Sequence, residues 1–181
     1  MKKIYAALVM VIVAAVALAV IAGCGGTTTT STTGGSNPQT AVNFWLKGQA
    51  TGNWDTFSSS ILPDNLKQLP ASSLDQMKQA LASSKGKYSF SGITMKTDIN
   101  TKDKTQALVT MTGGTISAPA TTSTPAQNQK VSDLPLIERL IYCRQYKGHW
   151  YVDMAATQQA QQQQQQQQST TPSSAPVTPP Q

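Results

Sequence analysis

The sequence has very few of the side chains that most often carry chemistry. Its 181 residues include 2 cysteines and 1 histidine, His149. One histidine without a cluster of further ligands falls short of the usual metal sites, and no glycine-rich loop precedes a helix to hold a nucleotide phosphate. We therefore expect no metal, no cofactor and no catalytic residue set. The two cysteines are Cys24 and Cys143, and if Cys24 is acylated, Cys143 has no partner within the chain, so the sequence gives no indication of a structural disulfide.

Acidic residues are also scarce. There are 8 of them against 14 lysines and arginines, which gives a formal net charge of +6. Lys2 and Lys3 belong to an export segment, so 12 basic residues remain against 8 acidic ones in the rest of the chain. They are scattered, whereas a nucleic-acid surface usually shows clustered Lys and Arg interleaved with aromatic residues. The pattern indicates an ordinary solvated surface and no nucleic-acid partner.

A single long hydrophobic run stands at the N-terminus. It follows Lys2 and Lys3, covers residues 4–22 without a charge, and ends in the letters IAGC, whose last residue is Cys24. This ending resembles the lipobox of bacterial lipoprotein signal peptides, in which an aliphatic residue and two small residues precede a cysteine. Small residues let a membrane protease cut before the cysteine, and the thiol receives the diacylglyceryl group. The resemblance implies a fatty-acyl anchor of the palmitate type on Cys24.

The alternative is an uncleaved transmembrane helix, because about 20 apolar residues are enough to span a bilayer. Two features favour cleavage. Glycines surround Cys24 and end the helix-forming run, and a flexible polar tract follows where a spanning helix would have charged anchors. In either case Lys2 and Lys3 stay in the cytoplasm. We expect the rest of the chain at the extracytoplasmic face of the cell membrane, or at the outer membrane of a cell that has two, with the membrane as its partner through the lipid.

Composition divides the chain into four parts. Residues 1–23 form the signal peptide. Residues 24–37 are the lipidated cysteine and a flexible Gly/Thr/Ser tether that has no large apolar residue to bury. Residues 38–154 show helical and strand periodicity and form one domain of ordinary size. Residues 155–181 are a Gln/Ser/Thr/Pro-rich tail, expected to be disordered, and composition leaves open whether this tail is a stalk or an end without function.

The first part of the domain has the pattern of three helices. The first begins at Pro38 with Asn37 as its N-cap and ends at Gly52-Asn53. Its apolar face is predicted to be formed by the residues at helical spacing, which are Ala41, Val42, Phe44, Trp45, Leu46 and Gly48.

Each of the next two predicted helices has an apolar face of only three residues. One carries Trp54, Phe57 and Ile61 and is stopped by Pro63. The last is predicted to begin with a capping box of Ser73 and Gln76 and to close at Gly86. Its buried stripe is formed by Leu74, Met77 and Leu81.

The pattern then changes to strands. The first strand is predicted to turn Ile93, Met95 and Ile99 to one face. The second is predicted to alternate, with Ala107, Val109 and Met111 on one face. The last is predicted to turn Trp150, Val152 and Met154 inward, with a tight turn at Lys147-Gly148 before it. Residues 117–133 are predicted to be an exposed loop. The predicted strands are Lys87–Ile99, Thr105–Thr112, Leu136–Tyr146 and His149–Met154. Helices followed by an antiparallel meander predict an α+β fold, with N-terminal helices packed on one face of a curved sheet.

The residues of this domain resemble a known superfamily. The letters AVNFW at 41–45, GNWD at 52–55 and the closing KGHWYVD at 147–153 are similar to small extracytoplasmic lipoproteins of the nuclear transport factor 2-like superfamily. That resemblance covers about residues 38 to 154 and implies helices on a cone-shaped sheet. The superfamily includes isomerases, dehydratases and cyclases as well as non-catalytic modules, and none of their catalytic motifs can be matched here.

Few titratable residues qualify for chemistry in the domain. His149 follows a turn and is expected to be solvated, and Asp98, Asp153 and Glu138 are expected to be surface charges. Four aromatic residues are expected to be core, or else to line a concave sheet, namely Tyr88, Phe90, Tyr142 and Tyr146. The sequence therefore favours a non-enzymatic envelope lipoprotein, a binding or scaffolding module whose partner is a small ligand or an envelope protein or polymer. The alternative is a pocket enzyme of the isomerase, dehydratase or cyclase type.

Overall fold

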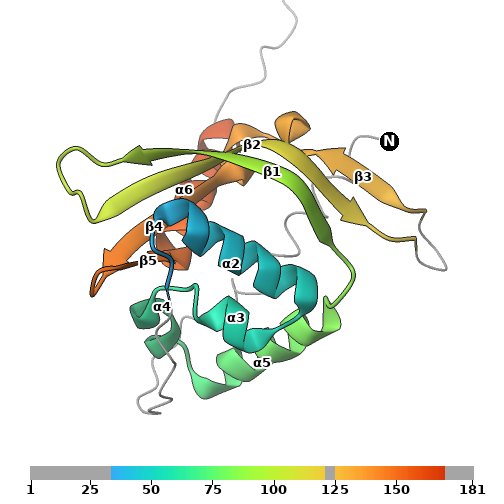
Figure 1. The fold of residues 1–181 in the computed structure, drawn as a ribbon, viewed down its shortest axis with the longest axis horizontal. Helices are drawn as coiled ribbons and strands as arrows, with labels where there is room; N and C mark the ends of the chain where they lie inside the picture. The colour runs from blue at the N-terminus through green and yellow to red at the C-terminus, as the bar shows by residue number, and fades with distance from the viewer. Residues whose placement is uncertain (1–33, 121–124, 170–181) are drawn as a thin grey trace, which may run out of the picture.

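The structure is a computed structural model that describes residues 34–120 and 125–169. The predicted signal peptide, Cys24, most of the tether and the end of the tail lie outside the described residues. Helices pack on a curled antiparallel half-barrel sheet, as the sequence predicted, and in Figure 1 the sheet arches over the helices. No helix within the two described ranges is long and apolar enough to span a membrane.

Helix α2 (Pro38–Thr51) is confirmed at both ends. The side-chain oxygen of Asn37 accepts a hydrogen bond from the backbone N–H of Thr40 at 2.9 Å, which satisfies a donor that the helix itself leaves free. Gly52 ends the helix in the left-handed conformation, at φ 64°, where other residues would be strained. Gly48 lets α3 (Trp54–Ser58) approach closely, because a Cβ atom there would lie 2.6 Å from Cα of Phe57.

The predicted boundaries of the next helices are wrong. Pro63 does not stop a helix but begins one, α4 (Pro63–Lys67), because a proline at the first helical position lacks only an N–H that would be free anyway. Ile61 lies between α3 and α4 and forms a bridge with Val152. Helix α5 (Ala71–Ser83) begins after Pro70, so Ser73 lies inside it and makes no capping box.

The sheet has the order β1-β2-β4-β5, with β3 also paired to β2 (Figure 1). The first hairpin is formed by β1 (Ser89–Ile99) and β2 (Gln106–Ala118). Ala107, Val109 and Met111 are buried, as predicted, but Ile99 is 52% exposed, because it is the last residue of its strand. Strand β2 also runs past the predicted end at Thr112, through two glycines, into the segment predicted to be loop.

The predicted loop of residues 117–133 is therefore partly ordered structure. It contains β3 (Gln127–Lys130), which pairs with the end of β2, and a 3-10 turn, η1 (Val131–Asp133). Val131 is fully buried in the core. A second 3-10 turn, η2 (Leu136–Arg139), replaces the predicted start of the third strand.

The chain ends its sheet with β4 (Leu140–Tyr146) and β5 (His149–Val152). Met154 is not a strand residue but begins α6 (Met154–Ser169). The prediction that the chain loses regular structure from residue 155 is thus wrong as far as residue 169. Residues outside the helix support its first turn, because Asn65 accepts from the N–H of Met154 at 2.8 Å and Asp153 accepts from that of Ala156 at 3.1 Å.

Candidate ligand-binding cavity

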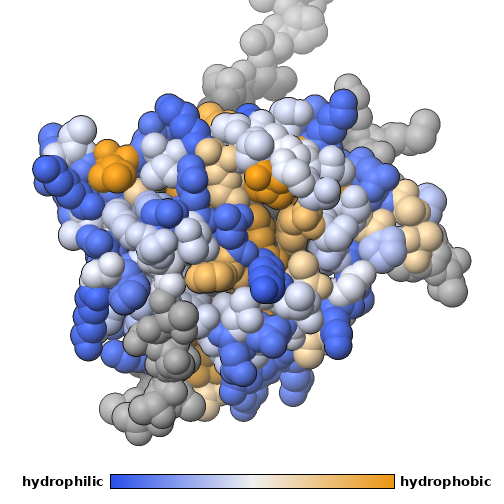
Figure 2. Space-filling model, viewed as in Figure 1, coloured by the Kyte–Doolittle hydropathy of each residue, from blue (hydrophilic) through white to orange (hydrophobic). Residues whose placement is uncertain are grey.

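A cavity of about 240 Å³ lies between the helices and the concave side of the sheet. Helices α2, α3 and α5 line one side, strands β1, β2, β4 and β5 line another, and η2 and α6 also contribute residues. In the face drawn in Figure 2, hydrophobic residues gather at the centre, where β1 passes α2, with polar residues around them. The fold therefore places a hollow where a curved sheet meets helices that do not fill it.

The walls of the cavity are mostly apolar. They include large side chains from every layer of the fold, among them Leu46, Phe57, Met77, Leu81, Phe90, Met111, Ile116 and Ile141. An apolar cavity of about 150 Å³ stays dry and binds benzene, and small-molecule sites run from about 300 Å³ upward. A cavity of 240 Å³ suits a small molecule of about ten non-hydrogen atoms when scaled from benzene.

Two hydrogen-bond donors belong to the side chains of this wall. Trp45 and Gln49 line the cavity from α2, and the indole Nε1 and the amide Nε2 are buried without a hydrogen-bond partner among the described residues. Gln49 is only 4% exposed. A buried unpaired donor lowers the stability of the fold by about 1–3 kcal/mol. The packing of the domain does not explain why two such donors lie on one face of a helix.

Among the described residues that line the cavity, Glu138 is the one with an acidic side chain. It is partly buried on η2, and burial raises the pKa of its carboxyl group above the ordinary value. Lys87 and Tyr88 also line the cavity, close to the start of β1. The prediction that Glu138 is a plain surface charge is therefore wrong.

Helix α6 closes one side of the cavity. Met154, Thr157, Gln158 and Gln161 line it at helical spacing. The helix is attached to β4, because the hydroxyl of Thr157 accepts from the N–H of Tyr142 at 3.1 Å. Beyond this first part, the helix is a glutamine run with little apolar surface to bury, so its attachment to the domain is concentrated at its N-terminal end.

Asp153 holds that attachment together and is not at the surface, which corrects the sequence prediction. It is 6% exposed, and its carboxylate lies 3.4 Å from Nε of Arg144. The same carboxylate caps α6. The backbone N–H of Asp153 donates to the carbonyl of Tyr142 at 2.8 Å. A buried carboxylate that has both a cation and a helix N–H group as partners is satisfied, so Asp153 has a structural role.

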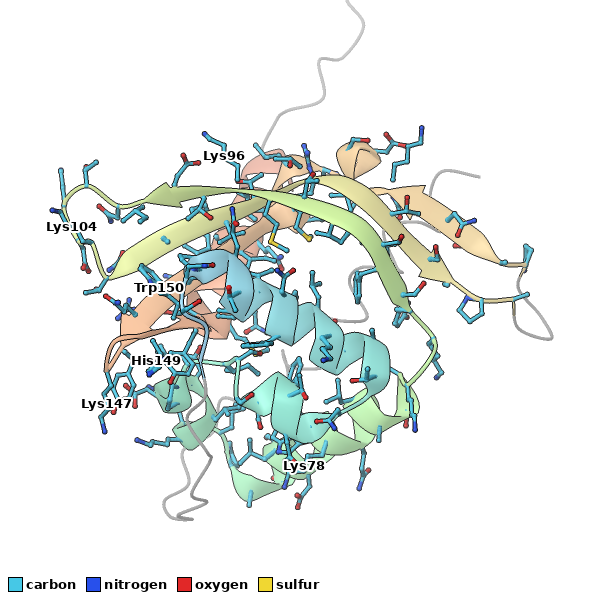
Figure 3. The ribbon with its side chains drawn as sticks, viewed as in Figure 1. Lys78, Lys96, Lys104, Lys147, His149 and Trp150 are labelled. Atoms are coloured by element: carbon cyan, nitrogen blue, oxygen red, sulfur yellow. The ribbon has the colours of Figure 1, made fainter. Side chains whose placement is uncertain are left out.

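The other sequence candidates lie apart from the cavity. His149 is exposed on β5, next to the buried Trp150 (Figure 3). Asp98 is exposed and pairs with Lys96 at 3.0 Å, and Lys96 points away from the helices (Figure 3).

The four aromatic candidates divide into two pairs. Tyr88 and Phe90 line the cavity, whereas Tyr142 and Tyr146 do not. Tyr146 instead packs edge-on against Tyr151, at 6.4 Å between ring centroids. Half of this set thus belongs to the candidate site, and the sequence pattern did not separate the halves.

Cys143 is a buried core residue on β4. Burial, together with the nearby charge of Asp153, raises the pKa of its thiol to about 12. A thiol that is neutral at ordinary pH is neither a nucleophile nor a metal ligand. Within the described ranges, no group of three or more His, Cys, Asp or Glu residues could hold a metal ion.

Comparison with known proteins adds no assignment. No protein-family model, no curated protein and no solved structure matches the chain.

Proposed function

We propose that this chain is an extracytoplasmic lipoprotein, held at the membrane by lipid on Cys24, whose folded domain binds a small and largely apolar molecule. The observation that carries the binding role is the 240 Å³ cavity with mostly apolar walls. Well-packed domains contain few voids larger than a water molecule. A hollow of this size, lined by residues of both core clusters, is therefore what a binding module requires.

The lipoprotein part of the proposal rests on the sequence ending IAGC at residues 21–24. The binding part also agrees with the resemblance to the nuclear transport factor 2-like superfamily, in which helices close a cone-shaped sheet. We include membership of that superfamily in the proposal. An apolar pocket at the cell surface suits a ligand that enters from the membrane or from outside the cell.

The test places a large side chain at the edge of the cavity, on α5. Ala80 is exposed and lines the cavity, whereas Ala82, which is also exposed on the same helix, does not line it. Ala80→Trp should weaken binding of a small apolar probe, α-methylstyrene, by about tenfold or more, a loss of at least 1.4 kcal/mol. Ala82→Trp is the matched control and should bind as the wild type does.

The measurement is a binding titration of the full chain, with circular dichroism to show that both variants are folded. Equal loss of binding in both variants, or no binding by the wild type, would contradict the proposal.

A second function is supported by Glu138. A carboxyl group whose pKa is raised by burial, in the wall of an apolar cavity, has the properties of a general acid or base. The domain would then be a pocket enzyme of the isomerase, dehydratase or cyclase type. Glu138→Gln separates the two functions, because it should abolish turnover of a bound ligand in an enzyme and leave binding unchanged in a binding module.

A further inference from the structure

The chemistry of the cavity wall narrows the class of ligand. Trp45 and Gln49 are four residues apart on α2, so their side chains lie one turn apart on the same face. Both line the cavity, and both have a nitrogen donor without a partner. The wall thus has two unpaired donors near each other. Among the described residues, no buried side-chain acceptor of the wall lacks a partner.

Both donors are neutral, and so is the ligand that suits them. A carboxylate would need a buried cation, since an unpaired charge is very costly to bury. The only lysine or arginine of the described cavity wall is Lys87, whose side chain is exposed. Glu138 is placed to repel an anion as well. A ligand oxygen of the carbonyl type, without charge, is the group that two neutral donors can receive.

Neither nitrogen is exposed to solvent in the ligand-free protein. A side chain of the wall must therefore move before a ligand oxygen can accept a hydrogen bond from them. The end of the Gln49 side chain supplies that movement, because the terminal amide torsion has broad energy wells. The gain is larger than for an exposed donor, since both nitrogens are shielded from solvent.

We propose that the cavity selects a neutral, largely apolar molecule with an oxygen acceptor at its buried end, such as a ketone or an ester, and that Trp45 Nε1 and Gln49 Nε2 donate to that oxygen. This inference rests on the proposed function, because it concerns the same cavity. The proposed function alone describes a largely apolar ligand. The two donors add the requirement that one end of this ligand has a polar, hydrogen-bond-accepting oxygen.

Three probes with equal numbers of non-hydrogen atoms test it, namely acetophenone, α-methylstyrene and benzoate. They share a phenyl ring and differ in the group that meets the donors, which is a neutral carbonyl, a hydrocarbon or a carboxylate. The full chain is reconstituted in phospholipid nanodiscs, and empty nanodiscs are the control. The free concentration of the two volatile probes is set through the vapour phase, so that partitioning into lipid does not enter the affinity.

Acetophenone should bind about 5- to 10-fold more tightly than α-methylstyrene, the ratio that one neutral hydrogen bond supplies. Benzoate should bind most weakly. The indole N–H resonance of Trp45 should move downfield with acetophenone and not with α-methylstyrene, because only the ketone accepts a hydrogen bond.

Gln49→Leu removes one donor at nearly the same volume, and Trp45→Phe removes the other and keeps an aromatic ring. Each should reduce the preference for acetophenone to within about twofold while α-methylstyrene still binds. Trp54→Phe is the control, because Trp54 does not line the cavity.

Three results would overturn the inference, and they differ in what else they refute. Equal affinities for ketone and hydrocarbon in the wild type would refute the donor role and leave the apolar binding function standing. Tightest binding of benzoate would show that Lys87 selects an acid. Failure of all three probes to bind would refute the proposed function and this inference with it.

Discussion

The structure predicts very different consequences for truncating two neighbouring residues on β5. Trp150 is 7% exposed and belongs to the larger core cluster with Ala41 and Val42 of α2. Its backbone also bonds to Gly35 in both directions, at 2.8 Å and 2.7 Å. His149 is exposed, and among the described residues its side chain has no hydrogen bond or ion pair that would be lost. His149 is the first residue of β5, directly after the Lys147-Gly148 turn, and this position leaves it exposed, whereas Tyr151, further along the same strand, is buried.

Truncation of a buried tryptophan to alanine costs about 3–5 kcal/mol, because apolar contacts are lost and a cavity is left. For a domain of this size, that corresponds to a fall in melting temperature of about 10–20 °C. Trp150→Ala should show this fall, and Trp150→Phe, which keeps a ring, should lie between. His149→Ala should change the free energy of unfolding by less than about 0.5 kcal/mol.

Thermal melts followed by circular dichroism measure all three variants under the same conditions. If the His149 variant melts far below the Trp150 variant, the register of β5 is wrong. The assignment of the concave face would then be wrong too, and with it the cavity.

Three further predictions concern other parts of the chain. Metabolic labelling with a fatty acid should mark the wild type and leave Cys24→Ser unlabelled; equal labelling would exclude the anchor. Asp153→Ala should detach α6 and expose the segment after residue 154 to proteases, because Arg144 and the N–H of Ala156 lose their partner, whereas Asp133→Ala, at an exposed position, should not. Cys143 should resist alkylation at pH 8 in the folded protein and react once the protein is unfolded, since its pKa is about 12 only when buried; fast reaction of the native protein would contradict its burial.

The parts of the fold that local residues specify were predictable from the sequence. Helix α2 has its cap, its proline and its final glycine within the segment itself, so Asn37, Pro38 and Gly52 predict both ends. The alternation of Ala107, Val109 and Met111 likewise predicts which face of β2 is buried. These signals depend on neighbours in sequence, which a linear pattern contains.

The parts that depend on distant residues were not predictable in this way. Helix α6 has no apolar periodicity, and its start depends on Asn65, which is far away in the sequence. Strand β3 is polar, and it is a strand because the end of β2 offers it a hydrogen-bonding edge. Sequence patterns for burial and propensity do not register such pairings.

The candidate site was predictable in part. Tyr88 and Phe90 were identified as residues that line a concave sheet or belong to the core, and they do line the cavity. Trp45 was predicted as an ordinary core residue of α2, and Gln49 was not identified at all. The signal that could have found Gln49 is its position one turn after Trp45, on a helix face that is otherwise apolar.

The most direct test of the central claim follows the methionine methyl groups by NMR while α-methylstyrene is added to the full chain. Met77, Met111 and Met154 line the cavity, whereas Met95, which is packed against the same core, does not. We predict that the first three resonances shift together along one binding curve and that the Met95 resonance does not shift. Uniform small shifts of all four, or no shift at saturation of the probe, would show that the domain has no ligand-binding cavity.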